Sequence, residues 1–141
     1  MSKPKRTVLI TGCSEGGIGA ALAVAFHDAG LRVIATARNP SKMESLKSAG
    51  IETLPLDVQS EASIQQCVGE LSSLDILVNN AGSGLLSPLS DVSVAQAKEL
   101  FDLNVWAQIA MTQACLPLLL KSEQAIIVNH TSSEHEIRKV P

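Results

Sequence analysis

Hydroxyl and amide side chains follow predicted strands or interrupt a predicted helix at a few places along this sequence. Asn79 and Asn80 end one apolar run, Asn104 lies among apolar residues farther on, and Ser132 and Ser133 follow the last apolar run. Ligands of open parallel sheets bind outside the carboxyl ends of the strands. A serine hydroxyl there can polarise a substrate carbonyl, and capping of a following helix is its alternative role. The amide of Asn104 must be satisfied, so it can bind a water or disturb its helix locally.

A glycine-rich segment with the sequence TGCSEGGIG lies at residues 11–19, between a predicted strand at 7–11 and a helix that begins at Ile18. The unpaired N–H groups of a helix N-terminus and the helix dipole favour an anion. This pattern is typical of a site for a dinucleotide pyrophosphate, with Ser14 as a hydroxyl donor, although the spacing G-x-G-x-x-G is not present. A tight strand-to-helix turn without a ligand is the alternative.

Two charged side chains end the next predicted strands. Arg38 ends the second strand, where an arginine pairs with a 2′-phosphate and an acidic residue would accept from a 2′-OH. The sequence therefore favours NADP(H) over NAD(H), and an exposed arginine without a ligand is the alternative. Asp57 ends the third strand and can accept a hydrogen bond from an adenine amino group. An ordinary Asx turn or helix cap is equally compatible with Asp57.

The remaining reactive side chains indicate no further site. His130, Glu134, His135 and Glu136 match no ligand spacing of a metal site. Cys13 could have a lowered pKa near a helix N-terminus, but a small apolar filler of the turn is the favoured interpretation.

Composition limits the class of protein. The 141 residues are 45% hydrophobic and 18% charged, which predicts one globular domain over residues 1–141. The net charge is −3 and the basic cluster at 3–6 is a solvated arm, so no nucleic acid is expected. The apolar stretch 110–120 contains Thr112, Gln113 and Pro117 and cannot span a bilayer. Three cysteines without disulfide spacing, and no signal peptide, predict a reducing, cytoplasmic location.

Strands and helices are expected to alternate. Strands are predicted at 7–11, 31–38, 51–58, 74–81 and 125–131, and helices at 18–29, 60–71 and 93–121, with a short helix before Gly50. In the first helix, the predicted inward face carries Ile18, Leu22, Ala25 and Ala29. Apolar strands alternating with helices indicate an α/β fold with a doubly wound parallel sheet. Right-handed crossovers make 3-2-1-4-5 the leading strand order, with 125–131 at an edge.

Six segments occur in one order along the chain. They are TGCSEGGIG at 11–19, Arg38, LDV at 56–58, NNAG at 79–82, LNVWA at 103–107 and IIVNHTSS at 126–133. In this set the chain resembles the short-chain dehydrogenase/reductase family from about residue 6 to residue 133. The amino-acid sequence of the glycine segment looks most like that of the fungal carbonyl and acyl-dihydroxyacetone-phosphate reductases of that family.

The resemblance implies a Rossmann-type fold and reversible, NADP(H)-dependent reduction of a small carbonyl substrate. Hydride would pass between nicotinamide C4 and a carbonyl or alcohol carbon. It also implies a role for each matching residue. Asn104 would belong to the proton relay, and Ser132 would hold the substrate oxygen. The cofactor-binding residues implied by the resemblance are Gly12, Ser14, Gly17, Ile18 and Gly19 for the pyrophosphate, Arg38 for the 2′-phosphate, Asp57 and Val58 for the adenine, and Asn80, Ala81 and Gly82 for the ribose region.

The chain departs from the family pattern in three ways. It contains no tyrosine, so the Y-x-x-x-K pair expected beyond Ser132 is absent; EHEIRKVP follows Ser133; and the glycine segment is one residue longer than usual. The family's C-terminal strands, much of the substrate pocket and the oligomerisation elements are also expected to be missing. Because a serine hydroxyl is too weak an acid to replace tyrosine, we expect no catalysis by this truncated chain.

Several interpretations of this pattern stay open. An incomplete or mis-spliced product of an active reductase gene is favoured over a degenerate relative. A non-catalytic dinucleotide-binding or interaction protein is the alternative function. A Rossmann-like methyltransferase is disfavoured by NNAG and by Arg38.

Overall fold

The computed structural model describes residues 5–132 and contains one parallel sheet of five strands in the order β3-β2-β1-β4-β5. The strands are β1 (Thr7–Ile10), β2 (Arg32–Ala37), β3 (Glu52–Pro55), β4 (Ile76–Asn79) and β5 (Ile126–Asn129). The predicted α/β class and strand order are confirmed. Strands β3 and β4 are shorter than predicted. Leu56, Val58 and Leu74 are buried although they lie outside these strands, and their apolar character had extended the predicted ranges.

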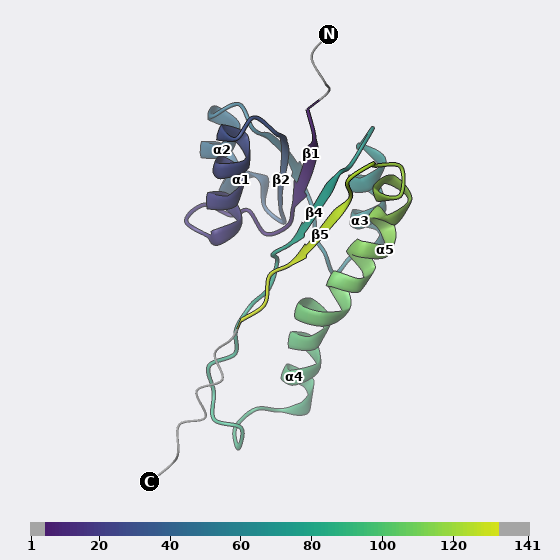
Figure 1. The fold of residues 1–141 in the computed structure, drawn as a ribbon. Coiled ribbons are helices and arrows are strands. Elements are labelled where there is room, and N and C mark those ends of the chain that lie inside the picture. Colours follow the sequence, from purple (N-terminus) through teal and green to yellow (C-terminus); the bar gives the residue numbers. More distant parts are fainter. Residues whose placement is uncertain (1–4, 133–141) are drawn as a thin grey trace.

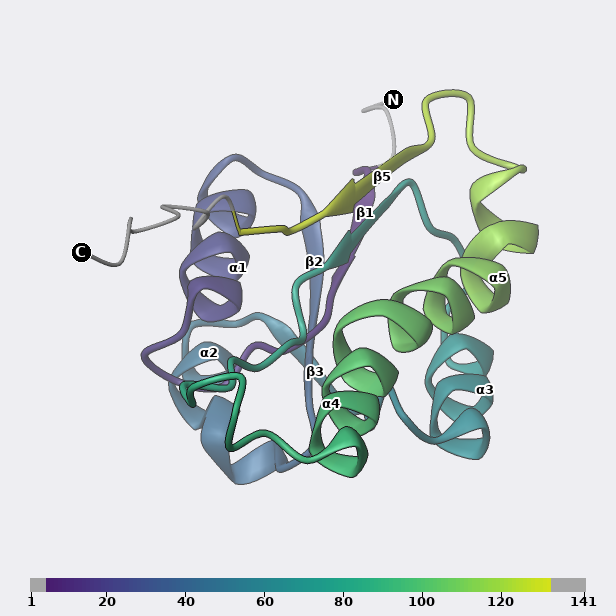
Figure 2. The same cartoon turned by 90° about the horizontal axis from the view of Figure 1, so that it is seen from below.

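Helices cover both faces of this sheet (Figures 1 and 2). On one face lie α1 (Ile18–Asp28) and α2 (Glu44–Ser48), the latter preceded by a 3₁₀ turn at Pro40–Met43. On the other face lie α3 (Glu61–Gly69) and α5 (Ala107–Leu119). Helix α4 (Val94–Phe101) leads into α5 through a π-helical turn, Asp102–Trp106. Because all five strands are parallel, their carboxyl ends lie at one edge of the sheet.

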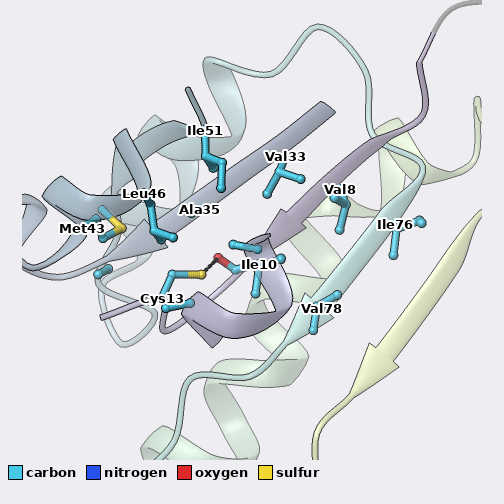
Figure 3. Packing of buried hydrophobic residues seen from close by; sticks show 13 residues of the cluster. Val8, Ile10, Cys13, Val33, Ala35, Met43, Leu46, Ile51, Ile76 and Val78 are labelled. Atoms are coloured by element: carbon cyan, nitrogen blue, oxygen red, sulfur yellow. Dashed lines mark hydrogen bonds between the residues drawn. The ribbon is translucent and has the colours of Figure 1, made fainter. Parts of the chain in front are cut away.

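Strand side chains alternate between two hydrophobic clusters, one on each face. Val8 and Ile10 of β1 belong to the cluster under α1 and α2, which Figure 3 shows, together with Met43 and Leu46. Leu9, between them, belongs to the cluster under α3 and α5. Burial on both faces is the expected pattern for the central strands of a parallel sheet covered by helices. Met43 and Leu46 are both buried in this cluster.

The predicted inward face of the first helix was wrong except at Leu22, which is partly buried against the cluster, whereas Ile18, Ala25 and Ala29 are exposed. Ile18 is 59% exposed, and the buried residues of α1 are Gly19, Ala20 and Ala23. These small side chains let α1 approach the sheet closely beside the glycine-rich segment. Periodicity favoured the larger apolar residues, whereas the close approach selects the smallest ones.

The single long helix predicted at 93–121 is divided by the π-helical turn. Ser93 begins α4 with a capping box, because its Oγ accepts from Gln96 N and its own N–H donates to Gln96 Oε1. Asn104 lies in the π-helical turn, so the local disturbance of the helix, one of the two alternatives considered for this residue, is present. Single-turn π-bulges inside helices often occur at functional sites.

Strand β5 lies at one edge of the sheet, as predicted. Ile126, Ile127 and Val128 are each about two-fifths exposed, unlike the fully buried residues of β1 and β4. Within the described residues, no helix is both long and apolar enough to span a bilayer.

Candidate functional site

A cavity of about 1440 Å³ opens at the carboxyl edge of the sheet. It is lined by residues of the glycine-rich segment, of the ends of β2 to β5 and of the π-helical turn. All predicted site residues except Gly19 line it: Gly12, Ser14, Gly17, Ile18, Arg38, Asp57, Val58, Asn80, Ala81, Gly82, Asn104 and Ser132. The fold therefore brings together residues that are up to 120 positions apart (from Gly12 to Ser132) at the edge where ligands of such sheets bind.

The glycine-rich segment crosses this edge in a conformation that requires glycine. Gly12 has a φ of +73°, and a Cβ at this position would lie 2.8 Å from the Cα of Ala81. Two backbone bonds tie the segment to its neighbours: Cys13 N donates to Thr36 O and Glu15 N donates to Lys42 O, each at 2.8 Å. The segment is thus held in place, and its glycines allow a ligand to approach the backbone closely.

Gly19 is buried behind that wall. A Cβ on Gly19 would lie 2.5 Å from Asn80 Nδ2 and 2.5 Å from Gly12 O. Its lack of a side chain therefore allows α1, the glycine-rich segment and the loop after β4 to meet. This observation separates Gly19 from the residues that line the cavity.

The N-terminus of α1 faces the cavity without a competing anion. Its N-cap, Gly17, has no side chain to cap the helix, and the first turn contains no acidic residue. Glu15, the nearest carboxylate in the segment, is exposed and does not contribute to the lining of this cavity. Free N–H groups at the positive end of a helix, beside a glycine wall, fit the pyrophosphate of a dinucleotide.

A hydrogen-bond network joins the carboxyl ends of β1 and β4. Thr11 Oγ1 accepts from the N–H groups of Asn80 (3.0 Å) and Ala81 (2.9 Å). In return, Asn80 Nδ2 donates to Thr11 O at 2.9 Å and to Gly12 O at 3.0 Å. The first asparagine of the pair, Asn79, is buried and donates to Asn129 Oδ1 and Thr112 Oγ1. The two adjacent amides thus hold the edge of the sheet together.

Charged residues gather where β2 and β3 end. Arg38 is exposed and lines the cavity with Asn39 and Lys42. Asp57 Oδ1 accepts from Gln59 N at 3.0 Å, so the Asx turn considered for this residue is present. Asp57 also lines the cavity, so the turn and an adenine contact are compatible.

Asn104 satisfies its side chain on the loop after β4. Its Oδ1 accepts from Ser83 N at 2.9 Å and its Nδ2 donates to Ser83 O at 2.8 Å. A Cβ on the adjacent Gly82 would lie 3.0 Å from Asn104 Oδ1, so the loop passes close to the π-helical turn. Asn104 therefore fixes the cavity wall beside the expected ribose region.

The end of β5 contributes Asn129, His130, Thr131 and Ser132 to the cavity. The helix cap considered for Ser132 concerns residues outside the described part of the chain. Residues 134–136, which belong to the histidine and glutamate cluster, also lie outside it. Among residues 5–132, no group of three potential metal ligands is present.

Cys13, within the glycine-rich segment, is fully buried, and its Sγ donates to Ile10 O at 3.3 Å (Figure 3). Burial raises the pKa of this thiol to about 11, although the nearby backbone of Thr36 acts in the opposite direction. A thiol that stays protonated has little redox reactivity, so its interpretation as an apolar filler is supported.

Lys42 and His130 are among the cavity residues that received no role from the sequence. Lys42 lies four residues after Arg38, and this proximity of two basic residues was the available signal. For His130 the signal was its position at the end of β5, where a histidine interrupts an apolar run.

Comparison with known proteins places these observations in a family. The sequence model of the short chain dehydrogenase family matches residues 6–139. A short-chain dehydrogenase/reductase of Pestalotiopsis microspora is 61% identical over 132 residues, which are 94% of this chain and 49% of the relative. The NADPH-dependent 1-acyldihydroxyacetone phosphate reductase of Schizosaccharomyces pombe is 40% identical over 128 residues, covering 87% of this chain and 43% of the reductase.

A solved structure supports the same assignment. The NADPH-bound carbonyl reductase from chicken fatty liver superposes with a TM-score of 0.82 at 27% identity, over 92% of this chain and 60% of that structure. The chain spans about half the length of the relatives that it matches. The match over nearly all of its residues, with the strand order and the glycine-walled cavity, shows that this chain belongs to the short-chain dehydrogenase/reductase family.

Proposed function

We propose that this chain is the cofactor-binding part of an NADP(H)-dependent oxidoreductase that interconverts a carbonyl compound and an alcohol. The observation that carries the proposal is the uncapped N-terminus of α1, which shares one cavity with a glycine wall and with Arg38. In this assignment, Gly12, Ser14 and Gly17 hold the pyrophosphate. The ribose region lies against the wall formed after β4, which Asn104 keeps in place.

The preference for a 2′-phosphate rests on two cations. Arg38 and Lys42 both line the cavity where β2 ends, and no acidic residue of that strand end is available to accept from a 2′-OH. The fission-yeast relative is named as an NADPH-dependent reductase, and the chicken carbonyl reductase was solved with NADPH bound. Both similarities agree with this preference.

The bound nicotinamide would supply or accept the hydride. Ser132, at the end of β5, would hold the substrate oxygen with its hydroxyl. A carbonyl that receives hydride also needs a proton donor, and the 141 residues contain no tyrosine to provide one. We therefore propose that the chain as printed binds the cofactor without turning over a substrate. The substrate, the partners and a cytoplasmic location belong to the same proposal; the three buried free thiols fit a reducing compartment.

Calorimetry with NADPH and NADH tests the cofactor assignment. The protein should bind NADPH more tightly, and Arg38→Met should weaken NADPH binding about tenfold or more while leaving NADH unchanged, because a hydrogen bond to a charged group contributes about 1.5–3 kcal/mol. Lys47→Met is the matched control, because Lys47 is also an exposed cation but does not contribute to the lining of this cavity. Equal affinities for the two dinucleotides in the unsubstituted protein would refute the role of Arg38.

An assay of NADPH oxidation tests the second part of the proposal. With a panel of small ketones and aldehydes we expect no carbonyl-dependent oxidation. Turnover that disappears in Ser132→Ala would show that a group other than a tyrosine can donate the proton, and would refute the proposed lack of catalysis. Absence of binding by either dinucleotide in a folded sample would favour a purely structural or interaction role.

A further inference from the structure

We propose that His130 is a positioning residue that, through Asn80, holds the glycine-rich segment in the conformation that receives the dinucleotide. The inference rests on the proposed cofactor function, because it names a residue of that same cavity. His130 does not itself belong to the glycine-rich segment; it acts on that segment through one intervening amide.

The sheet places the two side chains beside one another. Strands β4 and β5 are neighbours, and His130 N donates to Asn79 O at 3.0 Å, which extends their pairing by one bond. His130 Nδ1 lies 2.8 Å from Asn80 Oδ1. The side chain of His130, at the end of β5, therefore contacts the same Asn80 amide that donates to Thr11 O and Gly12 O after β1.

The direction of each hydrogen bond follows from the acceptors on the far side of Asn80. Thr11 O and Gly12 O are carbonyls and only accept, so the atom of Asn80 that faces them must be the NH₂ group. Asn80 Oδ1 then faces His130 and must accept. His130 Nδ1 consequently carries the hydrogen, which assigns the tautomer of the neutral ring.

This arrangement prevents the amide of Asn80 from turning over. If its two ends were exchanged, the amide oxygen would face two carbonyls and the NH₂ group would face the ring N–H. The two carbonyls thus set the orientation of Asn80, and the Nδ1–H of His130 stabilises that same orientation by donating to Asn80 Oδ1. Because the imidazolium form also has a hydrogen on Nδ1, both protonation states of the ring make the bond.

Two substitutions separate this role from simple packing. His130→Leu removes the donor, and we expect NADPH binding to weaken about threefold to tenfold, the factor that corresponds to one net hydrogen bond. His130→Asn places an amide nitrogen near the position of Nδ1, so it should bind NADPH within about twofold of the unsubstituted protein. Equal affinities of the Leu and unsubstituted proteins, or an Asn variant as weak as the Leu variant, would overturn the proposal.

Nuclear magnetic resonance gives a readout that does not depend on the cofactor. Nitrogen-15 shifts of the His130 ring should show hydrogen on Nδ1 in the neutral form, and hydrogen on Nε2 alone would overturn the proposal. The amide of Cys13, which donates to Thr36 O at 2.8 Å, should exchange faster in His130→Leu than in His130→Asn. Failure of the unsubstituted protein to bind NADPH would refute the proposed function, whereas the tautomer and the exchange rates would still decide the role of His130.

Discussion

The substitution Gly19→Ala tests whether close packing behind the cavity, rather than helix propensity, decides the residue type there. Gly19 is the second residue of α1. Alanine is a better helix former than glycine by at most about 1 kcal/mol, so local propensity alone favours the substitution. The tertiary structure predicts the opposite, because the new Cβ would lie 2.5 Å from both Asn80 Nδ2 and Gly12 O.

The magnitude follows from what must move. Gly12 O belongs to the backbone of the glycine-rich segment, so it cannot swing away as a flexible side chain could. Displacing Asn80 Nδ2 would weaken its bonds to Thr11 O and Gly12 O, each with a net value of about 0.5–1.5 kcal/mol. Overpacking typically costs about 1–3 kcal/mol. The overpacking and the weakening of one hydrogen bond together exceed the gain in helix propensity, so we expect the free energy of unfolding to fall by about 1–3 kcal/mol.

Urea unfolding followed by circular dichroism measures this free energy, and Gly69→Ala is the matched control. Gly69 is also helical, has no positive φ and has nothing within 4 Å of an added Cβ. Gly69→Ala should leave stability unchanged or raise it by up to about 1 kcal/mol. In calorimetry, Gly19→Ala should weaken NADPH binding by about tenfold or more, since the wall of the cavity shifts. If Gly19→Ala were as stable as Gly69→Ala and bound NADPH normally, close packing would not be what requires glycine at this position.

Three other predictions address the core, the acid side of stability and the thiols. Leu77→Ala should destabilise the protein by about 2–5 kcal/mol in urea unfolding because Leu77 is fully buried, whereas Leu86→Ala, at a fully exposed position, should change stability by less than about 0.5 kcal/mol. The hydrogen bond from Ser122 Oγ, and to a smaller extent the Thr7 N–H and Arg6, hold the pKa of Asp75 below its ordinary value of 3.8, despite an opposing effect of burial. A carboxyl whose pKa is lowered by folding stabilises the fold at pH values above its unfolded pKa, and this contribution is lost as the pH falls from about 4 through the lower folded pKa. The free energy of unfolding should therefore decline less steeply with falling pH in Asp75→Asn than in the unsubstituted protein. Identical slopes of the two proteins would contradict the assignment. Burial raises the pKa of each cysteine thiol to about 11 or 12. A disulfide reagent at pH 8 should therefore modify none of the three thiols in the folded protein and all three in urea. Rapid labelling of the folded protein would contradict the burial of the thiols.

Much of the fold and of the site followed from the sequence alone. Alternating apolar strands and helices determined a parallel sheet, and its handedness left one leading strand order, which the structure has. Because parallel strands end at one edge, the strand-end residues Arg38, Asp57, Asn80 and Ser132 had to meet there, and all line one cavity. The apolar pattern and the strand-end residues were sufficient to predict the sheet and this edge, because both depend only on residue type and order along the chain.

Tertiary structure decided the features that depend on distances between segments. Periodicity placed Ile18 on the inward face of α1, whereas the close approach to Asn80 and Gly12 buries Gly19 and leaves Ile18 exposed. Asn104 was expected to be satisfied somewhere, but only the fold shows that Ser83 satisfies it. His130 had no assigned role, because its partner Asn80 lies 50 residues away. Hydrogen bonds and steric contacts act over a few ångströms, so residues far apart in sequence acquire these roles only when the sheet brings them together.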